Sequence, residues 1–290
     1  MVYLILILSI FFTGVLQFVN KKISLLASPV FIAWVIALVS FVFTLPVLFT
    51  EEFRASDVPS FSWFLLALVT GAGYMTATIL FNTALKKGEI SELASFYNFS
   101  SIFTILTGFV IFRDAPSITG LIGILIIFLG SEITENGYQL KNFSHYTLAL
   151  KKPEVRMVLT AVLVNAIIIW IEKIGINATN NLVWSFAVQS FFVVMMTSLV
   201  FIKKEFKFSN FVKVYNPIVL FLVMLPILYL ARGFVLQDTS PAILASAMSL
   251  ANLVTILLGA IILRENHGRE KFHGGLVMVL GVIIINLGLF

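Results

Sequence analysis

The feature that most constrains this chain is a series of long apolar runs separated by short polar interruptions. A run of about 20 apolar residues has the length of a helix that crosses the roughly 30 Å hydrocarbon core of a bilayer. Hydrophobic residues make up 60% of the 290 residues and charged residues 11%, which is more apolar surface than a water-soluble domain can enclose. Helices satisfy their own backbone hydrogen bonds in lipid, whereas open sheet edges do not. The sequence therefore predicts an all-α, polytopic membrane protein.

Ten spans can be delimited in this way. They lie near 2–19, 29–49, 61–84, 91–112, 117–134, 156–175, 181–202, 215–236, 241–263 and 272–290. The first run has no basic residue before it and is followed by Lys21 and Lys22, so we expect it to remain as a helix and not to be a cleaved signal peptide.

The second half of the chain repeats the first at a fixed offset of 151 residues. The segments that align without a gap include Leu93-Ala94-Ser95 with Leu244-Ala245-Ser246, Thr104-Ile105-Leu106 with Thr255-Ile256-Leu257, and Gly123 and Gly130 with Gly274 and Gly281. Five spans per half is an odd number, so the halves are predicted to cross the membrane in opposite senses, as an inverted-topology repeat. We expect a first repeat over 1–136, a connecting loop over 137–153 and a second repeat over 154–290.

The distribution of basic residues predicts an orientation. The loops after even-numbered spans carry few of them, and the opposite side carries most, including Lys21, Lys22, Lys86 and Lys87. The positive-inside rule then places both termini outside the cytoplasm.

Two segments carry a resemblance to a known family. Thr104–Asp114 and Thr255–Glu265 each end in an arginine followed by an acid, and each precedes a glycine-spaced helix. This pattern resembles the EamA-type drug/metabolite transporter superfamily, although Ser101 and Asn252 stand where that family often has a proline. The resemblance implies transport of small organic solutes, and it implies cytoplasmic termini, against the charge distribution. We expect an integral protein of a prokaryotic cell (inner) membrane.

Interrupted helices are the first candidates for a site. Gly71, Gly73 and Tyr74 lie in the third span, and Pro226 lies at nearly the same level of the eighth. Glycine and proline loosen the backbone hydrogen bonds of a helix, so Gly71, Gly73 and Pro226 are predicted to act in gating around a central cavity. Kinking for helix packing is the alternative.

Arg232 is the charged residue to consider first, because an ionisable residue within a span is costly and usually faces a polar interior. A guanidinium binds carboxylates and phosphates in a bidentate manner, so Arg232 is predicted to anchor an anionic group. Extension of the side chain to the membrane surface is the alternative.

Uncharged polar and aromatic residues within spans complete the predicted substrate-binding set. They are Tyr74, Asn82, Tyr97, Asn98, Asn165, Gln189, Asn252, Trp34 and Trp184. The amides and hydroxyls suit hydrogen bonds to a solute, and the aromatic rings suit stacking on a flat or cationic one. Bonds between helices are the alternative for the polar residues.

The leading hypothesis is a transporter of a small neutral, zwitterionic or anionic solute that works by alternating access. The first span contains no acid, which disfavours proton-coupled export of cations; Glu132 or Glu172 is the remaining candidate for coupling. A non-transporting scaffold or sensor and an intramembrane enzyme are the alternatives. We expect no cofactor and no metal. The expected partners are the solute and the lipid bilayer, not nucleic acid, and a homodimer is left open.

Overall fold

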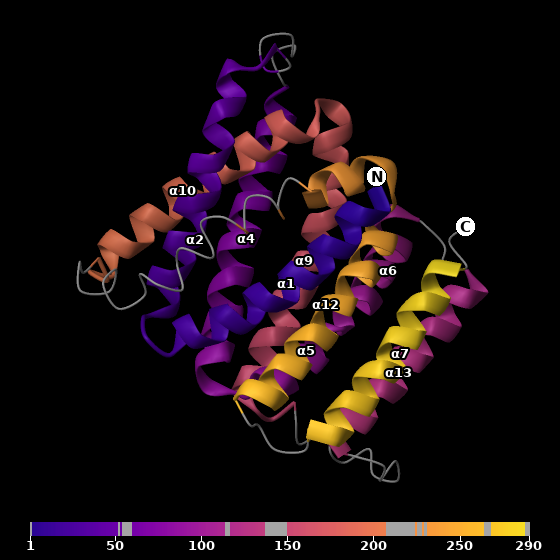
Figure 1. Ribbon diagram of the computed structural model, residues 1–290. Helices are drawn as coiled ribbons and strands as arrows, with labels where there is room; N and C mark the ends of the chain where they lie inside the picture. Colours follow the sequence, from indigo (N-terminus) through magenta and orange to yellow (C-terminus); the bar gives the residue numbers. More distant parts are fainter. Residues whose placement is uncertain are drawn as a thin grey trace.

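The computed structural model describes residues 2–51, 53, 60–113, 117–136, 150–206, 224, 228, 231–263 and 268–287. Every regular element in these ranges is a helix (Figure 1), which confirms the all-α prediction for the described part of the chain. The first half contains α1 (Val2–Ser24), α2 (Pro29–Thr44), the 3₁₀ helix η1 (Leu45–Phe49), α4 (Phe61–Lys87), α5 (Ile90–Tyr97), α6 (Phe99–Phe112) and α7 (Ile118–Asn136). The second half contains α9 (Pro153–Ala178), α10 (Asn181–Ile202), α12 (Pro241–Ile262) and α13 (Gly268–Leu287).

Helix starts are encoded locally. The side chains of Ser28, Ser60, Asn180 and Ser240 each accept a hydrogen bond from the backbone N–H three residues further on. Such N-caps satisfy a donor that the first turn leaves unpaired. Proline occupies the first turn of α2, α9 and α12, where its missing N–H costs nothing.

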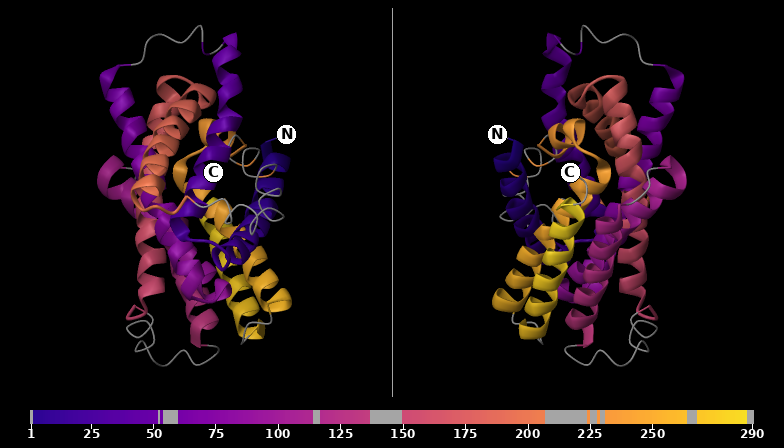
Figure 2. Two further views of the ribbon diagram at one scale, coloured as in Figure 1. Left: turned by 90° about the vertical axis from the view of Figure 1, so that its left-hand side faces the viewer. Right: turned by 90° about the vertical axis from the view of Figure 1, so that its right-hand side faces the viewer.

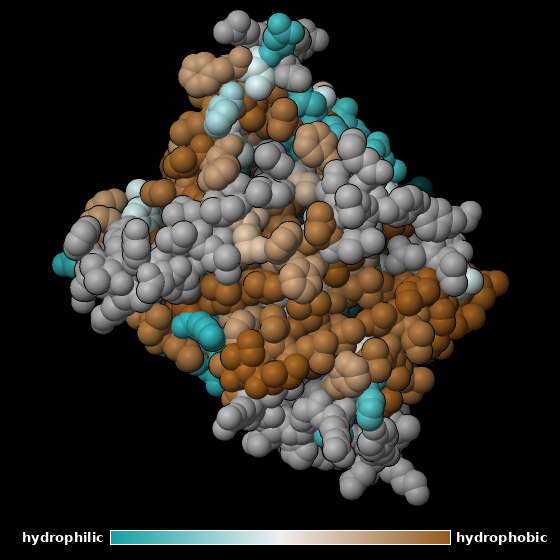
Figure 3. Space-filling model, viewed as in Figure 1, coloured by the Kyte–Doolittle hydropathy of each residue, from teal (hydrophilic) through white to brown (hydrophobic). Residues whose placement is uncertain are grey.

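Six helical stretches of the described residues are long and apolar enough to cross a bilayer. They are Pro29–Phe49, Phe61–Lys87, Ile90–Phe112, Pro153–Ala178, Asn181–Ile202 and Pro241–Gly259. Shorter apolar stretches lie in α7 and α13, at Ile118–Gly130 and Phe272–Ile285. Hydrophobic residues dominate the face in Figure 3 over α1, α12 and the α7–α13 pair, and large side chains such as Leu125 and Leu280 are more than half exposed. An outer surface of this kind suits contact with lipid.

The span predicted over 91–112 is divided into two α-helices at Asn98. The Asn98 side chain is buried, with its Nδ2 donating to Met278 Sδ (2.6 Å) and its Oδ1 accepting from Asn252 Nδ2 (2.6 Å). Both contacts come from the second half of the chain. A long-range contact, which helix propensity does not encode, therefore coincides with the break in this span.

The helices α7 and α13 pack against each other in opposite directions. They lie side by side in Figure 1, and Figure 2 places α13 next to α12 as well. A Cβ on Gly123 would lie 2.5 Å from the carbonyl oxygen of Gly281, and one on Gly130 would lie 2.7 Å from that of Gly274. By the repeat offset, Gly123 corresponds to Gly274 and Gly130 to Gly281. Exchanging the halves therefore converts each contact into the other.

The same exchange relates the contacts between α5–α6 and α12. Asn98 bonds to Asn252, and Ser101 Oγ bonds to Ser249 Oγ at 2.7 Å. The offset makes residue 98 equivalent to 249 and residue 101 equivalent to 252. The repeat offset thus exchanges the contacts of both helix pairs.

Contacts at the ends of two helices are also related by the repeat offset. Lys21 on α1 donates to the carbonyl oxygens of Leu85 and Gly88 at the end of α4. Lys173 on α9 donates to those of Leu236 and Gln237 at the end of the helical segment 231–238, each at 2.6 Å. Leu85 and Leu236 are equivalent by the offset. A lysine therefore satisfies the last carbonyls of corresponding helices in the two halves.

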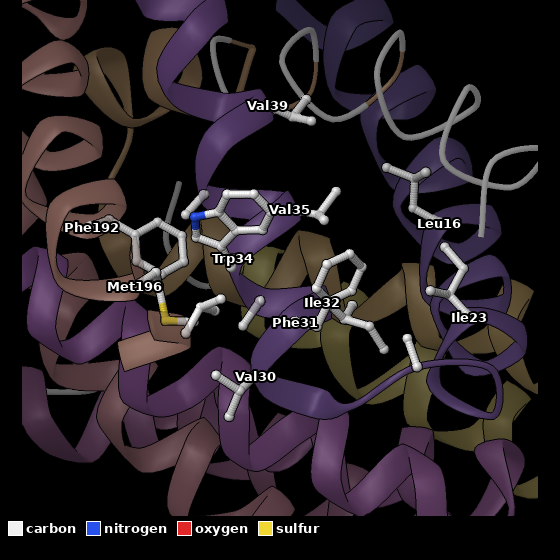
Figure 4. Packing of buried hydrophobic residues seen from close by; sticks show 14 residues of the cluster. Leu16, Ile23, Val30, Phe31, Ile32, Trp34, Val35, Val39, Phe192 and Met196 are labelled. Atoms are coloured by element: carbon white, nitrogen blue, oxygen red, sulfur yellow. The ribbon is translucent and has the colours of Figure 1, made fainter. Parts of the chain in front are cut away.

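An apolar core joins α2 to α10 (Figure 4). Phe192 and Met196 of α10 point toward Trp34 and Phe31 of α2. The indole Nε1–H of Trp34 donates to Thr197 Oγ1 at 3.0 Å, so a polar bond accompanies the apolar packing. This core forms one wall beside the polar cavity described next.

Candidate binding cavity

A cavity of about 290 Å³ lies between the two halves of the chain. Its walls come from α1, α2, α4 and α5 of the first half, from α9, α10 and α12 of the second half, and from Leu228 and Arg232. Its polar lining residues include Gln17, Asn20, Tyr74, Tyr97, Gln189 and Arg232. Both halves of the chain therefore contribute to one partly polar space.

Helical spacing explains how one face of each helix reaches the cavity. Tyr74, Ala77, Thr78 and Phe81 on α4 line it at intervals of three and four residues. Such intervals place side chains on one face of an α-helix. Leu228 and Arg232, which also line the cavity, are four residues apart in the sequence. The rise of 1.5 Å per residue gives the α4 wall a length of about 10 Å.

An ion pair stands at one end of this space. Arg232 Nη2 donates to Glu172 Oε2 at 3.0 Å, and the hydroxyl of Tyr74 donates to Glu172 Oε1. The Arg232 side chain is 30% exposed and lines the cavity, whereas that of Glu172 is 5% exposed and lies behind it. Tyr74 belongs to the first half, and the ion pair belongs to the second. The carboxylate thus connects the halves and neutralises the arginine.

A second, much smaller void of about 10 Å³ lies on the other side of the ion pair. Arg232 lines both spaces, and Glu172, Asn181, Trp184 and Ser185 line the void. Its size is close to the minimum that holds one water molecule. Arg232 and Glu172 therefore form a partition between the cavity and this void.

The cavity contains buried amide oxygens without a hydrogen-bond partner. They are Asn20 Oδ1 and Gln189 Oε1, and these two residues are 7% and 2% exposed. Two other amides in the wall are engaged: Asn165 Nδ2 donates to the Tyr97 hydroxyl at 3.3 Å, and Gln17 Oε1 accepts from Thr255 Oγ1 at 2.8 Å. A buried acceptor without a donor is costly unless a ligand or water supplies one.

Five of the residues predicted from sequence line the cavity together: Tyr74, Tyr97, Asn165, Gln189 and Arg232. The others lie elsewhere. Asn82 donates to the Thr78 carbonyl of its own helix, and Asn98 and Asn252 bond to each other between helices. Trp34 donates to Thr197, and Trp184 packs against Trp63 with ring centroids 5.3 Å apart. Asn98, Asn252 and Trp34 therefore bond between helices, whereas Asn82 bonds within its own helix.

The predicted interruption in the third span is wrong. The helix α4 runs from Phe61 to Lys87 without a break at Gly71 or Gly73. A Cβ on Gly71 would lie 3.1 Å from the backbone nitrogen of Phe192, and one on Gly73 would overlap the side chain of Ile168. The glycines let α10 and α9 approach α4 closely, which is the role of small residues between membrane helices. Pro226 lies outside the described residues.

Glu172 was named from sequence only as a candidate for coupling, because it lies close to the predicted end of the sixth span at 175. Helix α9 continues to Ala178, so Glu172 lies further from the end of the helix than predicted. Asn165 and Glu172 are seven residues apart, two helical turns on one face, and this spacing was the available signal for a shared site. Gln17 and Asn20 were not selected from sequence; Asn20 lay just beyond the predicted end of the first span at 19, whereas α1 continues to Ser24.

Within the described ranges, no three or more His, Cys, Asp or Glu residues gather in a way that would hold a metal ion.

Comparisons with known proteins agree with this architecture. A solved structure described as "Crystal structure of protein" superposes with a TM-score of 0.70 over 99% of this chain and 97% of that chain. The sequences are 10% identical, so the likeness concerns the fold alone. No curated protein matches the sequence. Residues 1–134 match the sequence model of the EamA-like transporter family, which confirms the resemblance noted in the sequence. The first half of this chain is therefore similar to the EamA-like transporter family.

Proposed function

We propose that the chain transports a small organic solute, which binds in the 290 Å³ cavity and reaches either side of the membrane by alternating access. The observation that carries this proposal is one polar cavity built from both halves of the chain, with Arg232 in its wall. Sites of this kind, at the interface of two repeats, are typical of secondary transporters. The family match over residues 1–134 supports the same class.

An inverted ten-span repeat is the frame that we propose for this motion. Its support is the exchange symmetry of the contacts Gly123–Gly281 and Gly130–Gly274, in which equivalent helices run antiparallel. If α7 and α13 both cross the bilayer, antiparallel packing requires a two-fold axis in the membrane plane. Two halves related in this way can rock about a central site and expose it to each side in turn.

The cavity limits the size of the solute. At roughly 30 Å³ per water molecule, a volume of 290 Å³ holds about ten waters, which is below the usual range for drug-sized ligands. Arg232, Tyr74, Tyr97 and Gln189 supply one charge and several hydrogen-bonding groups. The proposed solutes are therefore small neutral, zwitterionic or anionic metabolites.

A ligand screen tests the proposal. The purified protein in detergent is heated with members of four solute classes, which are amino acids, nucleosides, sugar phosphates and quaternary amines. Any solute that raises the unfolding temperature is then tested for uptake into proteoliposomes. We expect Arg232→Ala and Gln189→Ala to reduce uptake at least tenfold, since each removes a group from the cavity wall. Ser198→Ala, on an exposed side chain of α10, serves as the control and should transport normally.

Three outcomes would contradict the proposal. Uptake that every cavity variant retains would place the site elsewhere. A solute that stabilises the protein but is never transported would favour a sensor or scaffold. Conversion of the solute during incubation would favour an enzyme.

The cellular setting is part of the proposal. We place the chain in the inner membrane of a prokaryotic cell, where a reporter fused to the C-terminus reads the orientation. The charge distribution predicts a signal outside the cytoplasm, and the family resemblance predicts one inside.

A further inference from the structure

The charge of the cavity wall is set by two residues. Arg232 is the sole charged residue among the described residues that line the cavity. Glu172, 5% exposed, lies directly behind it and accepts its hydrogen bond at 3.0 Å. The two charges sum to zero, so an anionic solute entering this site would leave an uncompensated negative charge.

Such a charge is expensive in this environment. The cavity is lined by helices that are apolar on their outer faces, and the effective dielectric in a protein is low compared with water. Arg232 can bind an anion with its full charge only when its hydrogen bond to Glu172 is broken. Glu172 is held in place by a second bond from Tyr74, which opposes that release.

The unpartnered groups in the wall favour a different ligand chemistry. Asn20 Oδ1 and Gln189 Oε1 are buried acceptors, so a bound solute satisfies them with N–H or O–H donors. Gln189 lies on α10 and Asn20 near the end of α1. The cavity therefore offers hydrogen-bond acceptors from both halves of the chain, together with an arginine whose charge is balanced by Glu172.

Granting the proposed transport of a small solute, we propose that Glu172 determines which net charge the cavity accepts. With Glu172 ionised, the site takes neutral or zwitterionic solutes that carry N–H or O–H donors and rejects monoanions, which narrows the range of solutes proposed above. Without the carboxylate, Glu172 no longer offsets the charge of Arg232 and the site takes monoanions instead.

Benzoate and benzamide provide a matched test, because they have nearly the same shape and differ by one charge. Unfolding temperature is measured for the purified protein in detergent against each compound, at one low and fixed chloride concentration for all variants. The variants are Glu172→Gln, Glu172→Asp, Arg232→Gln and the double variant Glu172→Gln/Arg232→Gln.

We expect Glu172→Gln to bind benzoate on the order of tenfold more tightly than the wild type does, because a buried charge without its partner costs several kcal/mol. Benzamide binding should change much less. Glu172→Asp keeps the carboxylate and should retain the wild-type preference. The double variant lacks both charges, and its benzoate response should disappear again.

Equal benzoate affinity in the wild type and Glu172→Gln would overturn the inference, as would a benzoate gain that persists in the double variant. If a single variant unfolds on purification, the double variant, which keeps neither charge of the pair, is compared with the wild type instead. This assay measures binding alone. Failure of transport in proteoliposomes would therefore refute the proposed function while leaving the charge preference measurable.

Discussion

Among single residues, the carboxylate of Glu172 is central to the proposed site, because it accepts hydrogen bonds from two donors. Glu172 accepts from Arg232 of its own half and from Tyr74 of the other half. Hydrogen bonds to an ionised group are stronger than neutral ones, and truncating one partner of a buried charge pair is destabilising. The bond from Tyr74 is thus a link between the halves that a conformational change must break.

Replacing Tyr74 by phenylalanine removes this link and keeps the ring. We expect Tyr74→Phe to lower the free energy of unfolding by about 1–2 kcal/mol, the range for a hydrogen bond to a charged or membrane-buried group. Tyr97→Phe is the control, since its hydroxyl accepts a longer bond from Asn165 and does not touch Glu172. Denaturant titration in detergent measures both, and an equal loss in the two variants would contradict the role given to Glu172.

At this scale, the sequence indicated which residue types to consider but not which partners they have. Arg232, Tyr74, Tyr97 and Gln189 were selected as polar groups within apolar spans, and they line the cavity. Asn98 and Asn252 were selected on the same ground and bond to each other instead. When every face of a helix is apolar, sequence does not reveal which face is inward. The partner of a polar group in a span therefore has to come from the structure.

Among the helices, the starting residues agree with local sequence signals. Pro29 begins α2, and Pro153 and Pro241 begin α9 and α12, close to the predicted span starts. Ends were less predictable, because apolar runs stop before the helix does. Helix α9, for example, continues three residues beyond the predicted end of its span, to Ala178. Breaks were not predictable at all: α4 passes through two glycines, and α5 ends at Tyr97, next to Asn98.

The α7–α13 pair makes a prediction about glycine. A Cβ on Gly281 would lie 2.7 Å from the backbone oxygen of Gly123, which cannot move without shifting α7. A Cβ on Gly275 would meet the end of the Leu253 side chain, which can rotate away. Gly281→Ala should therefore destabilise the protein by about 1–3 kcal/mol, and Gly275→Ala by less. Thermal unfolding of the two variants checks the order, and the reverse order would show that the pair is not packed as described.

Lys173, in the last third of α9, leads to another prediction about stability. Lys173 donates to the carbonyl oxygens of Leu236 and Gln237, so Lys173→Met leaves two helix-terminal acceptors without their donor. We expect a loss of about 1–3 kcal/mol in the free energy of unfolding. Lys203→Met, on an exposed residue after α10, is the matched control and should unfold like the wild type. Indistinguishable midpoints for the two variants would contradict this assignment.

At the scale of the whole molecule, two halves enclose one site. The repeat offset read from sequence reappears as exchanged contacts between α7 and α13 and between α5–α6 and α12. The halves differ where the solute is proposed to bind: Glu172 stands at the position equivalent to Lys21, and Arg232 at that equivalent to Phe81. Symmetry thus supports motion, while the asymmetric residues give the site its chemistry.

Access to the cavity from both membrane faces is the central claim, and a single cysteine tests it most directly. The chain has no cysteine of its own, so Thr78→Cys places one thiol in the cavity wall. A membrane-impermeant thiol reagent is applied to proteoliposomes from the outside or from the lumen. Ser198→Cys, on an exposed side chain of α10 away from the cavity, is the control.

We predict that the thiol introduced by Thr78→Cys reacts from either face, and that a solute found in the stabilisation screen slows both reactions. The control should show no effect of the solute. Reaction from one face only, or rates that the solute leaves unchanged, would contradict a cavity that opens alternately to the two sides.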